Sequence, residues 1–478
     1  MKLPGIFVVM SLCFCNSSVW AEEIFRVSDA AQLQVAIKSA MPGDRIVMAN
    51  GIWRDADILF EAQGAVDRPI VLMAETPGKV VLSGASRLRI AGQWLVVDGL
   101  LFKDGALEGG SVIAFRKDRN SVAHHCRVTN TAIEEYNPAT KDIGYKWVSL
   151  YGTHNRVDHC YFRGQDHDGV TLVVWVGDGP NDHVIDYNYF AGRPPLGKNG
   201  GETIRVGTSH VSMTVSRTVV EHNLFENCNG ETEIVSNKSC GNIYRYNTFR
   251  ASNGMFTLRH GNACRVEGNF FFGQGVEGTG GVRVIGEDHL VVNNYFEGLE
   301  GTGTRSALTL VEGIPDSPLN GYWQVKRALI AFNTFVDCAQ TFEIGNRFGN
   351  RGRILPPVEV IVANNIAVGR SQMPVITQRD EKPDVRWVRN IYWGTELGAD
   401  AQMGWMHKDP LLEQREGILR TKGTSSAVDG AIGHYGVQFD IDGQIRTGKM
   451  DVGCDEFMLG AIVNRPLNAG DVGPAWMK

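Results

Sequence analysis

The sequence predicts an all-β protein, folded as a right-handed parallel β-helix with a short N-terminal capping helix. The main observation is a repeated segment of the form apolar-x-x-Asn-x-Phe, centred on Asn188, Asn223, Asn247, Asn269, Asn294 and Asn333. The tightest spacings between these asparagines are 24, 22 and 25 residues, a period that suits a coil of three short strands. Glycine is abundant, with 56 residues, as expected for a chain with many turns. We expect the asparagines to hydrogen-bond along one turn of the coil and the phenylalanines to fill its interior.

Residues 1–21 have the pattern of a cleavable export signal. Lys2 precedes an apolar run from Ile6 to Phe14, and Ala21 ends the segment before two glutamates. We therefore expect an exported protein, periplasmic or secreted, without a lipid anchor. No later stretch approaches 18 uninterrupted apolar residues, so we predict no membrane span.

A short helix is expected at about residues 28–41. Ser28 is the predicted N-cap, and Leu33 and Ile37 lie on one side of the helix. Short apolar strands follow at once, so we expect the lone helix to cover the open end of the β-stack. We expect residues 22–478 to form a single domain, with irregular final turns after about residue 395.

The charge of the chain gives no indication of a nucleic-acid partner. The formal net charge is −6, and no basic run interleaved with aromatic residues is present. These features do not indicate a nucleic-acid-binding protein.

Polar residues of four successive coils share one sector of the predicted coil. Counted from the repeat asparagine of each coil, Asn199 is at +11, Glu231 at +8, Glu233 at +10, Lys238 at +15, Arg259 at +12 and Arg283 at +14. Neighbouring strands are about 4.8 Å apart, so these residues should converge within about 15 Å on one outer face. Two glutamates at i and i+2 of one strand would point to the same side and would suit a hard cation.

The segments that carry these residues resemble polysaccharide lyase family 6. The matching stretches are NGGETIRVG at 199–207, ETEIVSNKSCGN at 231–242, TLRHGN at 257–262 and VRVIGEDHLVVNNYFEG at 282–298. The family contains alginate lyases and the dermatan-sulfate-cleaving chondroitinase B. The sequences of these segments resemble the one-domain alginate lyases more closely. The resemblance implies an anionic polysaccharide as substrate, Ca²⁺ on Asn199, Glu231 and Glu233, and catalysis by Lys238 and Arg259.

A uronate polymer such as alginate can be cut by β-elimination. A base removes the proton at C5 and the 4-O-glycosidic bond breaks, while a cation on the adjacent carboxylate stabilises the developing negative charge. We predict Lys238 as the base, and Arg259, which stays protonated, as the group that stabilises charge near the leaving oxygen. His260 either contacts sugar or is a packed surface ring. Arg283 either holds a substrate carboxylate or forms a structural salt bridge.

Three other functions stay open at this point. The chain could be a lyase for dermatan sulfate or a non-catalytic glycan-binding β-helix. It could also be a hydrolase of the pectin type, which would use carboxylates as acid and base. Lys238 and Arg259 favour the lyase, because neither a binding protein nor a hydrolase requires that pair.

Overall fold

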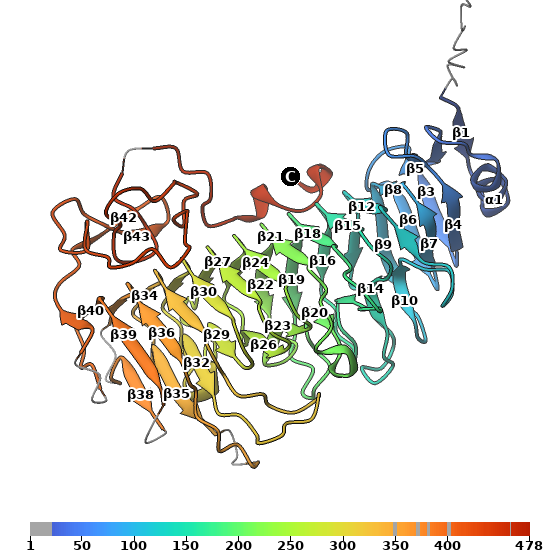
Figure 1. The fold of residues 1–478 in the computed structure, drawn as a ribbon. Helices are drawn as coiled ribbons and strands as arrows, with labels where there is room; N and C mark the ends of the chain where they lie inside the picture. The colour runs from blue at the N-terminus through green and yellow to red at the C-terminus, as the bar shows by residue number, and fades with distance from the viewer. Residues whose placement is uncertain (1–21, 348–350, 370–372, 380–382, 399–402, 459) are drawn as a thin grey trace, which may run out of the picture.

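The chain winds repeatedly through three long parallel sheets. The computed structural model describes residues 22–347, 351–369, 373–379, 383–398, 403–458 and 460–478. In the three long sheets, strands of successive coils pair in parallel, so the chain forms a parallel β-helix, as predicted (Figure 1). We call the three faces sheet 1, sheet 2 and sheet 3.

Sheet 1 precedes the asparagine turn in each coil. Its strands are β1 (Ile24–Val27), β2 (Arg45–Met48), β5 (Ile70–Ala74), β8 (Leu95–Asp98), β12 (Arg127–Thr129), β15 (Arg156–Asp158), β18 (Val184–Asp186), β21 (Val219–Glu221), β24 (Ile243–Arg245), β27 (Arg265–Glu267), β30 (Leu290–Val292), β33 (Leu329–Ala331), β36 (Val360–Ala363) and β39 (Val385–Val388).

Sheet 2 follows that turn. Its strands are β3 (Gly51–Arg54), β6 (Val80–Gly84), β9 (Leu100–Gly105), β13 (Ala132–Glu134), β16 (Tyr161–Arg163), β19 (Tyr189–Arg193), β22 (Leu224–Cys228), β25 (Thr248–Arg250), β28 (Phe270–Phe272), β31 (Tyr295–Glu297), β34 (Thr334–Val336), β37 (Ile366–Val368), β40 (Asn390–Trp393) and β41 (Trp405–His407).

Sheet 3 completes each coil and carries the candidate site. Its strands are β4 (Asp57–Gln63), β7 (Arg87–Gln93), β10 (Ser111–Ala114), β11 (Ala123–His124), β14 (Lys146–Leu150), β17 (Leu172–Val174), β20 (Ile204–Gly207), β23 (Glu233–Lys238), β26 (Met255–His260), β29 (Val282–Val284), β32 (Leu308–Val311), β35 (Phe342–Asn346) and β38 (Ile376–Gln378).

Two internal stacks hold the coils in register, and both were predicted from the repeat. The Asn223 side-chain amide donates to Asn247 Oδ1 at 3.0 Å, and Asn247 donates to Asn269 Oδ1 at 3.0 Å. The same bond continues through Asn294, Asn333 and Asn365 to Asn390. Inside sheet 2, parallel rings stack from coil to coil at 4.6–5.1 Å between centroids, through Phe162, Phe190, Phe225, Phe249, Phe271, Phe296 and Phe335.

The helix α1 (Ala30–Ser39) lies at the N-terminal end of the coil, where a cap was expected (Figure 1). Its buried face carries Leu33 and Ile37 and packs against β1, β2 and β4. The predicted N-cap at Ser28 is wrong. Asp29 has the extended backbone of an N-cap, and its carboxylate accepts from the Gln32 backbone N–H at 2.8 Å, which satisfies a donor that the helix leaves free.

The C-terminal residues pack back along the outside of the coil. After β41 the chain forms the antiparallel hairpin β42 (Leu412–Arg415) and β43 (Ile418–Thr421), and then irregular turns. Figure 1 shows the last segment returning toward the N-terminal coils, where the Trp476 indole donates to the Asn130 carbonyl at 2.8 Å. The short helices η1 (Ser209–Val211), η2 (Gly303–Arg305), η3 (Ala469–Asp471) and η4 (Ala475–Met477) lie in loops. Among the described residues, no helix is long and apolar enough to cross a membrane.

Candidate active site

Strands β20, β23, β26 and β29 lie side by side in sheet 3 and carry or flank the predicted site residues. Gly207 is in register with Lys238, and Lys238 is in register with His260. A groove of about 580 Å³ runs across these coils, and its walls include Asn199, Glu231, Glu233, Arg259 and Arg283. The phase count along the sequence therefore located residues that the fold brings together.

The two glutamates reach the groove by a different route from the one predicted. Glu233 is the first residue of β23, but Glu231 lies in a bend before the strand. The expectation that both glutamates lie on one regular strand is wrong. Glu231 lies outside β23, and β23 itself is bulged between Glu233 and Val235. A Cβ atom on Gly230 would lie 2.2 Å from the Gly201 carbonyl oxygen, so this bend requires glycine immediately before Glu231.

Asn199 lies in the exposed loop between β19 and β20, and two anchors hold that loop. The Lys198 ammonium lies 2.9 Å from Asp142 and 3.1 Å from Asp168. On the other side, the Gly200 backbone N–H donates to Glu231 Oε2 at 3.1 Å. The loop that presents Asn199 is thus tied directly to the acidic part of the groove.

A third carboxylate, Glu202, joins the two glutamates. One carboxylate oxygen from each of Glu202, Glu231 and Glu233 lies within 4.8 Å of the others, and we call these three residues the acidic cluster. Glu202 Oε2 and Glu231 Oε1 are buried and accept no hydrogen bond. Glu202 Oε1 lies 3.4 Å from Lys238 Nζ and 3.9 Å from Arg205. Glu202 was not among the residues predicted from the sequence, although its position, +14 from Asn188, is the phase of Arg283 in its own coil.

Glu231 and Glu233 have different electrostatic surroundings. Burial, together with the charges of Glu202 and Glu233, raises the pKa of Glu231 to about 8. Burial also opposes ionisation of Glu233, but Arg283 and Lys238 outweigh it and lower the pKa of Glu233 below its ordinary value. Glu202 and Glu231 each have a buried carboxylate oxygen without a hydrogen-bond partner, and such oxygens suit a bound cation.

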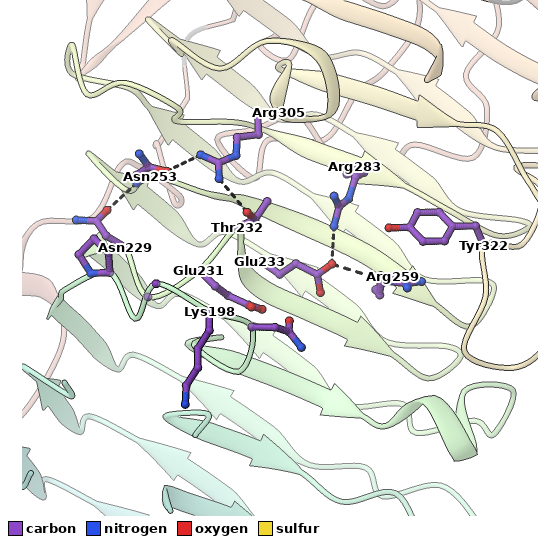
Figure 2. A pocket seen from close by; sticks show the side chains of 14 residues that line it. Lys198, Asn229, Glu231, Thr232, Glu233, Asn253, Arg259, Arg283, Arg305 and Tyr322 are labelled. Atoms are coloured by element: carbon purple, nitrogen blue, oxygen red, sulfur yellow. Dashed lines mark hydrogen bonds and ion pairs between the residues drawn. The ribbon is translucent and has the colours of Figure 1, made fainter. Parts of the chain in front are cut away.

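Glu233 is held by two arginines from later coils. Figure 2 shows Arg283 and Arg259 converging on its carboxylate from β29 and β26. Arg283 forms a close ion pair with Glu233 Oε1, and its side chain is only 5% exposed. The structural salt bridge considered for Arg283 is therefore present. Its contact with a substrate carboxylate stays a prediction, and its Nε has no hydrogen-bond partner.

Arg259 is placed by a bulge and by a long loop. The register between β23 and β26 shifts after Asn237, so Arg259 lies between the residues that pair with Asn237 and Lys238. Its guanidinium donates to the Gly321 carbonyl at 2.9 Å and covers the Tyr322 ring at 4.1 Å from the centroid. Tyr322 lies in the insertion that lengthens one repeat spacing to 39 residues, where a phase count gives no position.

His260 is buried beside the two basic residues. The residue is 2% exposed, and Nε2 of its ring lies 3.3 Å from Ser209 Oγ. Burial and the neighbouring charges of Arg259 and Lys238 lower the pKa of His260 to about 2, so the ring is neutral at ordinary pH. The ring is packed, as considered from the sequence, but it is buried rather than at the surface. Sugar contact by His260 stays a prediction.

Arg305 lines the other end of the groove and was also missed. It donates to Asn253 Oδ1 at 2.6 Å and to Thr232 Oγ1 at 2.8 Å (Figure 2). Both acceptors are neutral, so the guanidinium adds positive charge to the groove wall.

The site thus combines an acidic cluster that suits a hard cation, an amine next to that cluster, and three guanidiniums along one open groove. Carboxylate oxygens suit a hard divalent cation, the amine can exchange a proton, and the guanidiniums can hold negative charge. This combination suits an anionic substrate that loses a proton.

Comparisons with known proteins point to one family. A family model described as Chondroitinase B matches residues 27–440. The solved structure of the polysaccharide lyase family 6 alginate lyase AlyGC has a TM-score of 0.85 and 38% identity, covering 95% of this chain and 58% of that chain. A mannuronic acid specific family 6 lyase from human gut microbiota has a TM-score of 0.73 and 33% identity, covering 80% of this chain and 90% of that chain.

A third structure, the family 6 lyase Pedsa3628 from Pseudopedobacter saltans, has a TM-score of 0.70 and 28% identity, covering 95% of this chain and 99% of that chain. No curated protein matches the chain. The chain spans 58% of the length of AlyGC.

Proposed function

The chain belongs to the chondroitinase B family, polysaccharide lyase family 6, and we propose that it cleaves alginate by β-elimination with the help of Ca²⁺. The observation that carries this proposal is the position of the acidic cluster between a lysine and two arginines. Glu202 lies against Lys238. Glu231 and Glu233 line the same groove as Arg259 and Arg283. A groove rich in guanidiniums suits a polyanion, and an amine beside a cation site suits proton removal next to a carboxylate.

The residues present fit a calcium ion. The acidic cluster supplies carboxylate oxygens, two of them without a partner, and Asn199 supplies an amide oxygen from the loop anchored on Glu231. These are the ligands that Ca²⁺ prefers. Bound there, Ca²⁺ would withdraw charge from the substrate carboxylate and so make the adjacent C5 proton more acidic.

Lys238 takes the C5 proton in this proposal. The electron pair of the C5–H bond forms the C4–C5 double bond, the C4–O bond breaks, and the leaving oxygen takes a proton from water. Glu202 lies 3.4 Å from Nζ and holds the amine in place, while Arg259, clamped by Gly321 and Tyr322, stabilises charge near the leaving oxygen. Arg283 offsets the charge of Glu233, so that an anionic sugar meets a less negative groove.

Dermatan sulfate is the second candidate substrate. The matched family model is the one described as Chondroitinase B, whereas the solved structures with more than 30% identity are alginate lyases or mannuronate-specific. We favour alginate for that reason and because the sequence segments around the site resemble alginate lyases.

The test is an ultraviolet assay on separate substrates. Purified enzyme is mixed with alginate, with its mannuronate-rich and guluronate-rich fractions, and with dermatan sulfate, and the absorbance of the new conjugated double bond is followed. We expect a signal on alginate. A signal on dermatan sulfate alone would show that dermatan sulfate, and not alginate, is the substrate. New reducing ends without ultraviolet absorbance would show that the enzyme hydrolyses the chain and does not cleave it by elimination.

We also propose that the protein is exported. The candidate signal lies at residues 1–21, outside the described residues, so its support is the sequence pattern alone. N-terminal sequencing of the protein recovered from a cell envelope or culture supernatant tests it, with Glu22 expected as the first residue. Recovery from the cytoplasm with Met1 intact would contradict export.

A further inference from the structure

A column of outward residues on sheet 3 continues from the active site toward the N-terminal coils. Gly207 is in register with Lys238. The pairing of Leu150 with Val174, and of Val174 with Val206, puts the next residues, Tyr151 and Trp175, in the same column. The pairing of Ala114 with Ser149 extends the column to Arg116 two residues on.

The aromatic rings of this column contact two guanidiniums, one at each end of the ring stack. The Arg116 guanidinium lies 3.8 Å from the centroid of the Tyr151 ring. Tyr151 and Trp175 are stacked with 5.8 Å between centroids and 5° between planes, and Arg205 lies 5.7 Å from the Trp175 ring centroid. The Trp175 indole also donates to Ser149 Oγ at 3.2 Å. The rings therefore hold the guanidiniums in place while leaving their N–H groups for another acceptor.

The cations of sheet 1 are arranged differently. Arg127 pairs with Asp158, Arg156 with Asp186 and Arg245 with Glu221, each at 2.5–2.6 Å. Those arginines already have carboxylate partners.

Carboxylate partners are scarce in the column. Among the described residues, no carboxylate pairs with Arg116 or with Lys146, which lies on β14 beside the column. Arg205 is 3.9 Å from Glu202, a carboxylate that also serves Lys238. Burial and the charge of Arg205 lower the pKa of Lys146. Arg116 and Lys146, which have no carboxylate partner among the described residues, lie with Arg205 on one face of a protein of net charge −6. Such cations suit a bound anion.

We propose that Arg116, Lys146 and Arg205 form a remote subsite that binds carboxylates of the polyuronate chain several sugar units from the bond that is cut. Four strand spacings separate Arg116 from Lys238, or about 19 Å, so a short oligosaccharide in the catalytic groove would not reach Arg116 whereas a polymer would. This inference rests on the proposed function, and it concerns the length of substrate that the enzyme grips.

Substrate length is the variable in the first experiment. Arg116→Ala should raise KM for alginate polymer about three- to tenfold, the loss expected for one charge-assisted contact at a partly exposed site. The change for an alginate trisaccharide should stay below twofold. Arg116→Lys keeps the cation and should recover part of the loss. Arg163→Ala is the matched control, because Arg163 lies on sheet 2 and pairs with Glu135.

Equal losses on polymer and trisaccharide would overturn the proposal, because Arg116 would then act through the fold or the catalytic groove. An unchanged KM for polymer would overturn it as well. The melting temperature of each variant shows whether it is folded.

A binding experiment separates this inference from the proposed reaction. In the Lys238→Ala background, binding of mannuronate polymer is measured by calorimetry with and without Arg116→Ala. We expect about the same three- to tenfold weakening of Kd. If the wild-type enzyme proves inactive on uronates but Arg116→Ala still weakens polymer binding, the proposed reaction fails and the subsite stands. If the enzyme is active and polymer binding does not depend on Arg116, the subsite fails and the reaction stands.

Discussion

Calcium and a proton should compete for Glu231. Burial and the charges of Glu202 and Glu233 raise the pKa of Glu231 to about 8 in the metal-free protein, so below that pH the carboxylate carries a proton. A cation must displace this proton to use the carboxylate. The apparent affinity for Ca²⁺ should therefore fall about tenfold for each pH unit below 8, or about 2.7 kcal/mol between pH 8 and pH 6. Glu233 adds nothing to this slope, because its pKa is lowered and it is ionised throughout.

Isothermal titration with Ca²⁺ at pH 6, 7 and 8.5 measures the effect. Repeating the titration in buffers of different ionisation enthalpy counts the protons released per bound Ca²⁺. We expect close to one proton at pH 6 and a small fraction of one at pH 8.5. Glu202→Gln is the matched variant, because removing a neighbouring charge should lower the pKa of Glu231 and move the pH dependence downward. Equal affinities at pH 6 and pH 8.5, with no proton released, would refute the competition.

The proton on Glu231 should also affect folding stability. A carboxyl whose folded pKa is raised stabilises the native state below its unfolded pKa, and that contribution is lost as pH rises through the folded value. On this account metal-free protein loses stability between about pH 4.5 and pH 8, and saturating Ca²⁺ should restore most of the loss at pH 8.5. A metal-free melting temperature that rises over this range in Glu231→Gln and wild type alike would speak against the assignment.

Three further predictions concern catalysis and the scaffold. Lys238→Ala should lower kcat about 100- to 10,000-fold, as for loss of a general base, while a cooperative melting transition persists; loss of that transition would make Lys238 structural. Arg259→Lys should lower kcat at least about 100-fold, because an ammonium cannot both bond to Gly321 and cover Tyr322; near-normal kcat would contradict its role. Asn247→Ala should destabilise the protein by about 3 kcal/mol in urea unfolding, since buried partners on both sides lose hydrogen bonds; an unchanged midpoint would show that the ladder contributes little.

The scaffold could be predicted because its repeat consists of particular residue types at fixed positions of the repeated segment. The central coils have an asparagine at the turn and a phenylalanine two residues later, so the ladder through Asn223 and the stack through Phe225 follow from a count of residues. The error at Ser28 is of another kind: Ser28 and Asp29 are both good N-caps, and which of them caps depends on the backbone angles at the helix start.

The site could be predicted only where phase and motif coincide. Glu231, Glu233 and Lys238 lie in one short motif with characteristic spacing. Glu202 is recognised only by its burial and by a carboxylate oxygen without a hydrogen-bond partner, and neither can be read from the sequence. Tyr322 reaches Arg259 from an insertion of unrelated length. The C-terminal return of the chain, with Trp476 at Asn130, depends on contacts between residues far apart in sequence and has no periodic signal.

Removal and return of the metal test the central claim most directly. Enzyme that has been exhaustively chelated should stay folded, because the stacked coils do not depend on the acidic cluster, but it should no longer generate ultraviolet-absorbing product from alginate. Ca²⁺ should restore activity, and Mg²⁺ should restore less, because it is smaller and dehydrates reluctantly. Metal-free enzyme that still cleaves alginate at the normal rate would show that Lys238 and the arginines suffice, and that the acidic cluster has no part in the reaction.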